Sequence, residues 1–496
     1  VSDDVYYYNP QKVPPVVNHG TPEFPDYAAT RYYSSDFTEK RMVSYFGRLG
    51  YNYKQRYLLE FTFRRDGSST FGEGNRWANF PSVAVGWSFS EEPFIKRLTG
   101  GWLNWGKIRG SYGKSGQTFT SAYLAHGLMN IMDKSFFGKT GITTDKPVSP
   151  YLTWEKTRQY DLGLDMDMFN YRLNVKLDYY YKYTSSLIYD IPIPGSLYAF
   201  GAQVENAMEI SNEGLELELQ ADILRESAVS WRMKFNMARN WNRFEKSYSG
   251  KDVVDGDGTL LVVGRPLNGL YVWAHRGYYN SDAEVPRLYK IDGQEIYFNG
   301  VATNGISGAV GDYRLLDLDG DGNPDSYYAG SPLPLAHGGW VNELMWKNFD
   351  LNVLVNFTIG RKMINNRMGL GFSRQSEDGH LTKLFDYRKL RPWDGVNKKP
   401  NAPAWGNSLS MNTDSAIEKV HHLALKQITL GYNLPDRISK KAGLSGVRFF
   451  LTAENLFYLS NYSGGNPEVV NIYTGRDNGD TYPLPRKYTL GLTLNF

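Results

Sequence analysis

Thirteen segments of this sequence alternate apolar and polar residues with a period of two. In the last of them, YTLGLTLNF (488–496), every second residue from Tyr488 to Phe496 is apolar, and the residues between them are Thr, Gly or Asn. Such alternation predicts a β-strand with one apolar and one polar face. The segments are 43–53, 56–66, 81–90, 104–113, 156–168, 172–184, 213–223, 231–240, 337–346, 349–359, 419–432, 446–456 and 486–496.

The connections between these segments alternate in length. The short and moderate ones are 54–55, 91–103, 169–171, 224–230, 347–348 and 433–445. Between them come the mostly long connections 67–80, 114–155, 185–212, 241–336, 360–418 and 457–485. Outer-membrane barrels join their strands in this way, with short periplasmic turns and long extracellular loops, whereas a soluble sandwich has no reason to sort its loops. The sequence therefore predicts an all-β fold, an antiparallel transmembrane β-barrel.

The composition agrees with this fold and excludes other classes of protein. Aromatic residues make up 15% of the chain, with 37 Tyr and 12 Trp, and 50 residues are Gly, which is typical of a β-protein with many turns. The formal net charge of +3 gives no electrostatic reason to expect nucleic acid as a partner. The absence of Cys excludes disulfides, thiolate metal sites and a cysteine nucleophile.

The alternation of sides also predicts where the chain enters the barrel. If the terminal strand ends at the periplasmic side, with Phe496 in an aromatic girdle, then residues 1–42 lie outside the cell. Thirteen strands that start outside cannot close a single-chain barrel, which needs an even number. We therefore expect an odd number of strands before Val1, with 1–42 as an extracellular loop segment and 43–496 as the C-terminal portion of the barrel.

Several motifs, in a fixed order, carry a family resemblance. They include FRRDGSSTFGEGNRWANFPSVAVGWSFSEEPFI (63–95), NEGLELELQADI (212–223), GSPLPLAHGGWVNELMWKNFDL (330–351) and LALKQITLGYNLP (423–435). With these motifs the chain resembles the SusC/RagA-like family of TonB-dependent outer-membrane transporters, from about residue 43 to the end. No single motif carries the resemblance, which makes it specific.

The resemblance implies a 22-stranded barrel with an N-terminal plug, so that nine strands, the plug and the TonB box are absent from this chain. It further implies import of large nutrients, usually oligosaccharides (glycans) and in some members oligopeptides. The implied partners are a SusD-like surface lipoprotein that acts as a lid, and TonB, which acts through the missing N-terminal region. The implied location is the outer membrane of a Gram-negative bacterium, in contact with its lipid and lipopolysaccharide.

The clearest chemical motif is DLDGDGNPD, which matches the first part of an EF-hand calcium loop. Gly322 at position 6 permits the sharp turn, but position 12 is Tyr328 rather than a bidentate Glu, so Asp312 or water has to supply a further ligand. We expect Ca²⁺, with Mg²⁺ as the alternative ion and a metal-free loop as the other possibility. Its expected role is to brace the loop 241–336. The candidate ligands are Asp317, Asp319, Asp321, Asn323 and Asp325.

Three tryptophans in the long loops, Trp273, Trp393 and Trp405, are candidate substrate-binding residues. Their faces can stack on sugar rings or hold peptide side chains, and they can equally pack the loops together or against a lid protein. The pair Asp165 and Asp167 shares one face of a predicted strand, as in a glycosidase pair, but a water-filled lumen is expected to be polar in any case.

No catalytic motif such as HExxH or GxSxG occurs, so we expect no enzyme. Two rival functions remain. One is a barrel with hydrolase activity at its rim, which needs a Ser/His/Asp set that the sequence does not display. The other is a soluble or surface glycan-binding β-protein with a calcium-braced loop. Fractionation separates the second rival from a barrel, because salt or chelator would release it from the membrane.

Overall fold

The computed structural model describes residues 39–496 apart from short stretches, mostly in the long loops. The stretches not described are 119–121, 124, 128, 137–138, 145–146, 199, 226, 255–259, 285–286, 290–294, 298–309, 317, 319–324, 367–390, 397–398, 405–412 and 480. The expected loop segment 1–42 thus lies almost wholly outside the described residues. Its last residue, Met42, already belongs to the first strand.

One antiparallel sheet dominates the described part of the chain, and its main path runs through thirteen strands in sequence order. Each predicted segment corresponds to one of these strands, so the thirteen-strand prediction is confirmed. The strands are β1 (Met42–Tyr53), β2 (Tyr57–Ser68), β3 (Trp77–Trp87), β4 (Leu103–Gln117), β7 (Glu155–Met168), β8 (Leu173–Pro192), β9 (Ala202–Leu224), β10 (Val229–Lys246), β19 (Ala336–Trp346), β20 (Phe349–Asn365), β21 (Ile417–Asn433), β22 (Gly446–Ser460) and β24 (Lys487–Asn495).

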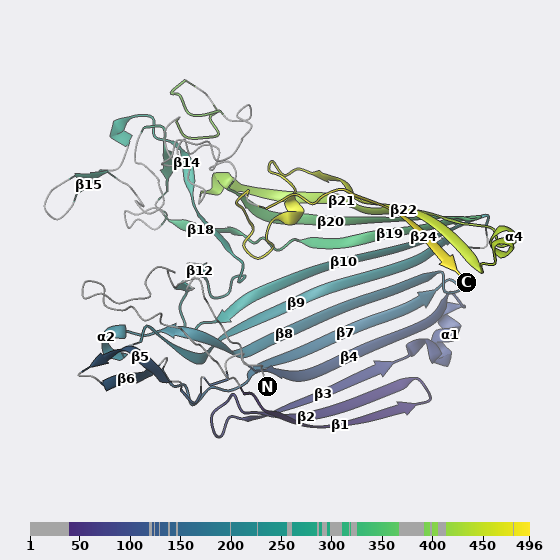
Figure 1. Cartoon of the computed structure of the whole chain (residues 1–496), viewed down its shortest axis with the longest axis horizontal. Helices are drawn as coiled ribbons and strands as arrows, with labels where there is room; N and C mark the ends of the chain where they lie inside the picture. The colour runs from purple at the N-terminus through teal and green to yellow at the C-terminus, as the bar shows by residue number, and fades with distance from the viewer. Residues whose placement is uncertain are drawn as a thin grey trace, which may run out of the picture.

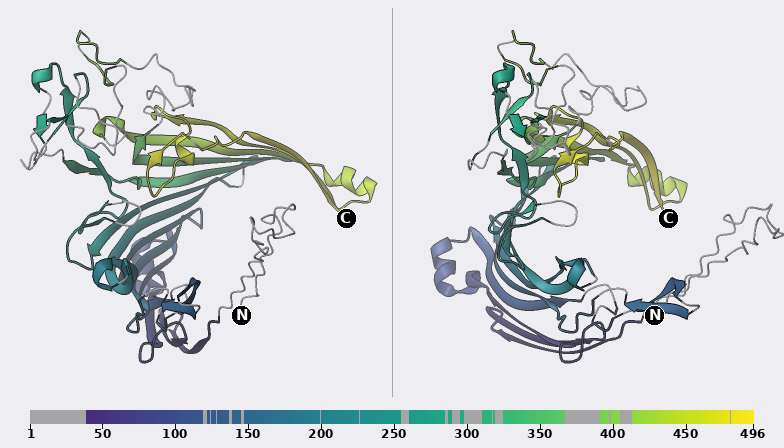
Figure 2. Two further views of the ribbon diagram at one scale, coloured as in Figure 1. Left: turned by 60° about the vertical axis from the view of Figure 1, so that its left-hand side comes forward. Right: turned by 90° about the vertical axis from the view of Figure 1, so that its left-hand side faces the viewer.

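The sheet curves into an open trough, with β1 and β24 as its two edges. Figure 2 shows this trough end-on in its right-hand view, where the N-terminal strands and the C-terminal strands form the two arms of an arc. Among the described residues, no helix has both the length and the apolar character needed to cross a membrane.

All the short connections lie at one end of the sheet, where the label C also lies in Figure 1. One of the tight ones joins β1 to β2, and its residues Lys54 and Gln55 both have positive φ, as a hairpin turn that matches strand twist requires. Two moderate connections at this end carry the helices α1 (Pro93–Thr99) and α4 (Asp436–Ser439). The predicted sorting of connections by length is therefore confirmed.

The long connections at the other end contain small sheets of their own. Within the described residues these are two-stranded, and β23 (Arg476–Asp477) adds in parallel to β20. The small strands are β5 (Met129–Phe136), β6 (Lys139–Thr144), β11 (Val253–Val254), β12 (Leu260–Leu261), β13 (Leu270–Trp273), β14 (His275–Tyr278), β15 (Arg287–Tyr289), β16 (Glu295–Tyr297), β17 (Tyr313–Leu315) and β18 (Ser326–Gly330).

Several strands extend well past their predicted ends, always toward the long loops. β8 continues eight residues beyond the predicted 184, to Pro192, and β9 starts at Ala202 rather than 213. Residues of these extensions, such as Val204 and Met208, pack into small clusters beneath the long loops. The extensions therefore do not show the alternation that marks a strand between lipid and lumen. The predicted strand 81–90 is wrong at its other end, because Phe89 begins the 3₁₀ turn η2 (Phe89–Glu91).

Candidate functional site: the inner wall and the inward-folded loop

The two faces of the large sheet differ sharply in chemistry. On the convex outer face, apolar side chains are exposed, and no described part of the chain covers them. Leu162 on β7, for example, is 57% exposed, and Leu490 on β24 is 82% exposed. The concave inner face carries the alternate residues of the same strands, which are polar or charged. This is the arrangement of a wall between lipid on one side and water on the other.

A ladder of ion pairs crosses the inner face from strand to strand. Arg109 on β4 lies 3.0 Å from Asp165 on β7 and also pairs with Asp178 on β8. Further along the sheet, the ladder continues with Lys176–Glu218 at 3.3 Å, Lys234–Glu343 at 2.8 Å and Arg448–Asp350 at 2.5 Å. Each of these pairs is partly solvated and adds only about 0.2–1 kcal/mol. Their main effect is to leave the inner wall polar but almost neutral.

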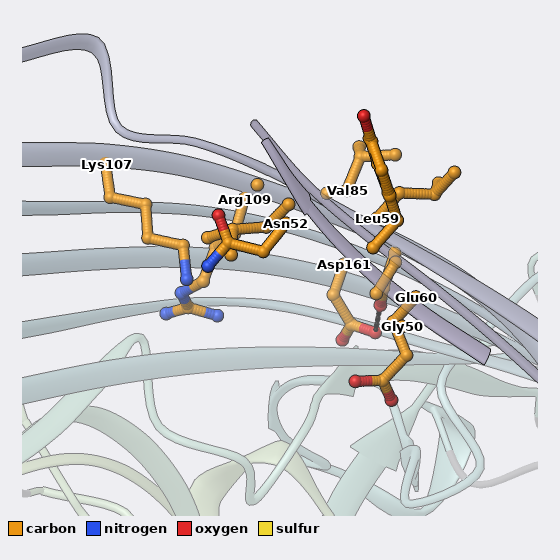
Figure 3. Close-up of a pocket in the computed structure, with 14 residues that line it drawn as sticks. Gly50, Asn52, Leu59, Glu60, Val85, Lys107, Arg109 and Asp161 are labelled. Atoms are coloured by element: carbon orange, nitrogen blue, oxygen red, sulfur yellow. Dashed lines mark hydrogen bonds between the residues drawn. The ribbon is translucent and has the colours of Figure 1, made fainter. Parts of the chain in front are cut away.

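A pocket of about 440 Å³ opens on this inner face, across β1 to β4 and β7. Figure 3 shows its two sides, with Lys107 and Arg109 gathered on one and Glu60 and Asp161 on the other. Leu59 and Val85 point away to the opposite face, as alternation requires. With both signs of charge and a Ser111–Asp161 hydrogen bond of 2.9 Å, the pocket suits a polar protein surface better than an apolar ligand.

The short-turn end of the sheet is lined with aromatic rings that stack from strand to strand. The ring centroids are 6.4 Å apart in Tyr53–Tyr57, 6.2 Å in Trp346–Phe349 and 4.7 Å in Phe349–Tyr432. Such a row is what a membrane-interface aromatic belt looks like.

A buried carboxylate anchors the first helix-bearing connection at this end. Tyr57 donates a hydrogen bond of 2.7 Å to Glu92, and Arg56 lies 3.3 Å from the same carboxylate. The hydrogen bond from Tyr57 holds the pKa of Glu92 below its ordinary value, so Glu92 stays ionised at neutral pH.

At the opposite end, the connection between β22 and β24 folds inward onto the inner face of β20 and β21. Arg361 on β20 is only 4% exposed and donates hydrogen bonds to the backbone carbonyls of Pro467, Val470 and Asn471, at 2.7–3.1 Å. We call residues 461–477 the inward-folded loop. No sequence pattern predicted it, because a single Arg in a strand gives no sign of its partners.

Two further side-chain pairs on the strands are Asp165 with Asp167 and His421 with His422. Asp165 and Asp167 do share the inner face, but Asp165 pairs with Arg109, and Asp167 accepts a hydrogen bond of 2.8 Å from Asn174. His421 is exposed, whereas His422 is buried and lies 4.0 Å from Glu468 of the inward-folded loop. The two histidines therefore face opposite sides of the sheet, as adjacent residues of a strand do.

Of the five candidate calcium ligands, only Asp325 lies within the described residues. Its carboxylate points back into the loop and accepts a hydrogen bond of 2.5 Å from the Leu318 backbone N–H. Asp317, Asp319, Asp321 and Asn323 lie outside the described residues, and the described part alone contains no cluster of three metal-binding side chains.

The candidate tryptophans occupy different environments. Trp273 is half-buried at the end of β13 and forms a bridge to Thr413. Trp393 donates a hydrogen bond of 3.3 Å to Asn280, and its ring packs so closely over Gly311 that no Cβ would fit there. Trp393 thus packs separate loops together, which is one of the two roles that the sequence left open for it. Trp405 lies outside the described residues.

Comparison with known proteins identifies the family. Residues 2–330 match the family described as TonB dependent receptor-like, beta-barrel. The chain belongs to this family. Similar proteins include TonB-dependent receptor P26 of Formosa agariphila, 32% identical, and TonB-dependent receptor SusC of Bacteroides thetaiotaomicron, 29% identical. These alignments cover 93% and 95% of the chain but 47% and 45% of the relatives, so the chain spans about half the length of the curated relatives it matches.

Solved structures agree on the fold of this TonB-dependent receptor-like barrel. The structure of the RagAB peptide transporter superposes with a TM-score of 0.77 at 23% identity. The match covers 98% of the present chain and 50% of the solved chain. The RagAB peptide importer in its closed-closed state gives a TM-score of 0.76 at 22% identity and the same coverage. The resemblance to the SusC/RagA-like family is therefore confirmed, and the open trough corresponds to part of a larger TonB-dependent receptor barrel.

Proposed function

We propose that this chain forms the C-terminal wall of an outer-membrane importer that takes up large nutrients together with a surface lipoprotein. The observation that carries the proposal is the open sheet itself, with a lipid-compatible outer face, a polar and nearly neutral inner face, and every short turn at one end. Membership of the TonB-dependent receptor-like family supports energy coupling through TonB. That coupling, and the plug that responds to it, belong to the half of the protein that this chain does not span.

We assign the wall two tasks in the import cycle. The polar pocket of Figure 3 and the ion-pair ladder face the plug, whose charged surface they can accept without a buried unpaired charge. The inward-folded loop and the long loops narrow the opposite end of the lumen, where a SusD-like lipoprotein would close over them. Trp273 and Trp405 are the proposed substrate contacts at that end, since aromatic faces stack on sugars and on peptide side chains alike.

The substrate is an oligosaccharide or an oligopeptide. The resemblance to SusC/RagA-like transporters, which usually import oligosaccharides, supports the glycan, and similarity to the RagAB peptide transporter supports the peptide. The many exposed apolar side chains of the outer face argue against the rival function, a soluble glycan-binding protein, because so large an apolar surface is unfavourable in water.

The first test is purification of the native complex from outer membranes. We expect the protein to require detergent for extraction and to bring with it a surface lipoprotein and the plug-bearing remainder, identified by mass spectrometry. Release by high salt or chelator, with neither partner present, would contradict the importer. Uptake of labelled glycan and peptide mixtures by cells with and without the protein then decides the substrate class.

We further propose that the DLDGDGNPD loop binds Ca²⁺, with Asp317, Asp319, Asp321, Asn323 and Asp325 as ligands. Changing Asp319 and Asp321 together to Asn is expected to weaken calcium binding at least about tenfold, because two charged ligands are lost. Terbium luminescence of the full-length protein in detergent measures this, with EGTA as a blank. Asp394→Asn, in another long loop, is the control, and an equal loss in both variants would refute the site.

A further inference from the structure

A second pocket, of about 270 Å³, lies where β10 separates from β19. The ladder between these two strands ends at the pair Ala238–His337, although β10 continues to Lys246. The gap is lined by residues 239–242 of β10, by Gly360 and Lys362 of β20, and by residues of the connection between β10 and β19, namely Pro266, Tyr328, Gly330, Ser331 and 333–335. It therefore lies between the wall and the connection that leaves it.

The cationic side chains of this pocket point outward, away from the lumen. Arg239 and Trp241 have the same parity as Met237, which is exposed on the outer face of β10. Lys362 donates a hydrogen bond to the carbonyl of Ala329, and Ala329 packs in one cluster with Ile364. Since Arg361 and Met363 face the inward-folded loop, Lys362 and Ile364 lie on the outer side.

The chemistry of the pocket is that of an anion site with aromatic walls. Two of its lining residues stack on each other, since the guanidinium of Arg239 lies 4.4 Å from the centroid of the Trp241 ring, and Tyr328 adds a second aromatic side chain to the lining. Its lining residues include Arg and Lys, hydroxyl and amide groups, but no Asp or Glu. A positive pocket without a carboxylate attracts a negatively charged group, and Arg binds phosphate through two parallel hydrogen bonds.

The position of the pocket indicates that the negatively charged group belongs to a lipid. Next to it on the outer face lie Leu335, Trp340 and Ile359, which are 45%, 40% and 41% exposed. They belong to the same apolar face as the rest of the outer wall, so lipid reaches up to the pocket. The long loops lie beyond it. Cationic and aromatic groups at the upper edge of an apolar band are at the depth of lipid headgroups.

We propose that this pocket binds the phosphate-bearing headgroup of a glycolipid in the outer leaflet. Arg239 and Lys362 pair with the phosphate, and Trp241 packs beside the sugar that carries it. The proposal rests on the proposed function in one respect, because it takes the long-loop end to be the outside of the membrane.

The test is native mass spectrometry of the full-length protein in mild detergent, titrated with lipid A or with chemically dephosphorylated lipid A. We expect Arg239→Gln/Lys362→Gln to weaken lipid A binding about tenfold or more, because each cation near a lipid surface contributes on the order of one kilocalorie. Dephosphorylated lipid A should bind the unaltered protein as weakly as lipid A binds the variant. Inorganic phosphate at millimolar concentration should not displace lipid A.

The matched control is Lys54→Gln/Arg65→Gln, which also removes two cations stacked on aromatic rings, those of Tyr53 and Trp77, outside the pocket. This variant should bind lipid A like the unaltered protein. Equal binding of lipid A by both double variants, or equal binding of the dephosphorylated lipid, would overturn the proposal, and displacement by phosphate would reduce it to a simple anion site. If the protein imports nutrients but fails this test, only the proposal of a lipid site is contradicted. If the protein does not associate with the membrane, the proposed importer function is contradicted as well.

Discussion

Leu162→Arg is expected to lower the free energy of unfolding by about 2–4 kcal/mol, because it places a cation on the lipid side of β7. Leu162 lies on the outer face in the middle of the sheet, with β4 and β8 as neighbours, and its side chain is 57% exposed. Its directly paired neighbours on that face, Gly110 and Tyr179, carry no charge that could neutralise an Arg side chain. The measurement is the folded fraction in lipid vesicles across a urea series, read from heat-modifiable gel mobility.

Gln159→Arg is the matched control for this experiment. Gln159 lies on the same strand but on the inner face, where it donates a hydrogen bond of 2.8 Å to Asp161. An Arg at this position meets water and a carboxylate, so the midpoint in urea should change by little. If both variants were equally destabilised, the assignment of an outer lipid-facing side and an inner lumen-facing side would be wrong.

Arg361→Met is expected to release the inward-folded loop while leaving the barrel wall intact. The substitution removes the three hydrogen bonds that the buried Arg361 donates to Pro467, Val470 and Asn471, and it leaves these three carbonyls without that donor. A hydrogen bond to a charged group contributes about 1.5–3 kcal/mol, and not all of that loss is recovered by water. Amide hydrogen exchange in 461–477 should accelerate by roughly a hundredfold, as should proteolytic cleavage there.

Two comparisons make the experiment on the inward-folded loop decisive. Lys176→Met removes an inner-wall cation whose partner, Glu218, is well solvated, and it should leave exchange in the loop unchanged. Arg361→Lys keeps the charge but cannot reach three carbonyls at once, so its exchange rate should fall between the two. Unchanged protection of the loop in Arg361→Met would show that the contacts of Met363 and Val420 with Tyr462 hold it instead.

The sequence predicted the large sheet well, and the reason is physical. A strand between lipid and water must alternate, so Tyr488 to Phe496 and its twelve counterparts could be recognised one at a time. Beyond the membrane this constraint disappears, which is why the extensions of β8 and β9 were missed. The small sheets of the long loops, such as β13 with β18, were missed for the same reason, since four-residue strands are defined by their partners rather than by a pattern.

The candidate site was predictable only in part. The alternation along the strand correctly placed Asp165 and Asp167 on the same face, because this alternation is a local property of the sequence. The role of Arg361 depends on a loop more than a hundred residues away, and the outer pocket depends on where two strands part, so neither leaves a trace in local sequence. The calcium motif remains a prediction, since it was read from spacing alone.

The ion-pair ladder has a consequence for how the strands find their alignment. A slip of β8 by one residue against β7 would turn Lys176 and Asp178 toward lipid and Leu177 into water. A slip by two residues would keep each side chain on its correct face but would place Asp178 opposite Asp161 or Asp165. In the observed register Asp178 lies opposite Gly163, and Arg109 reaches the carboxylates of both Asp165 and Asp178. The apolar alternation thus disfavours register shifts by an odd number of residues, and the charges disfavour shifts by an even number. Ion pairs that add little to the stability of the folded barrel therefore still help to select the correct strand register during assembly.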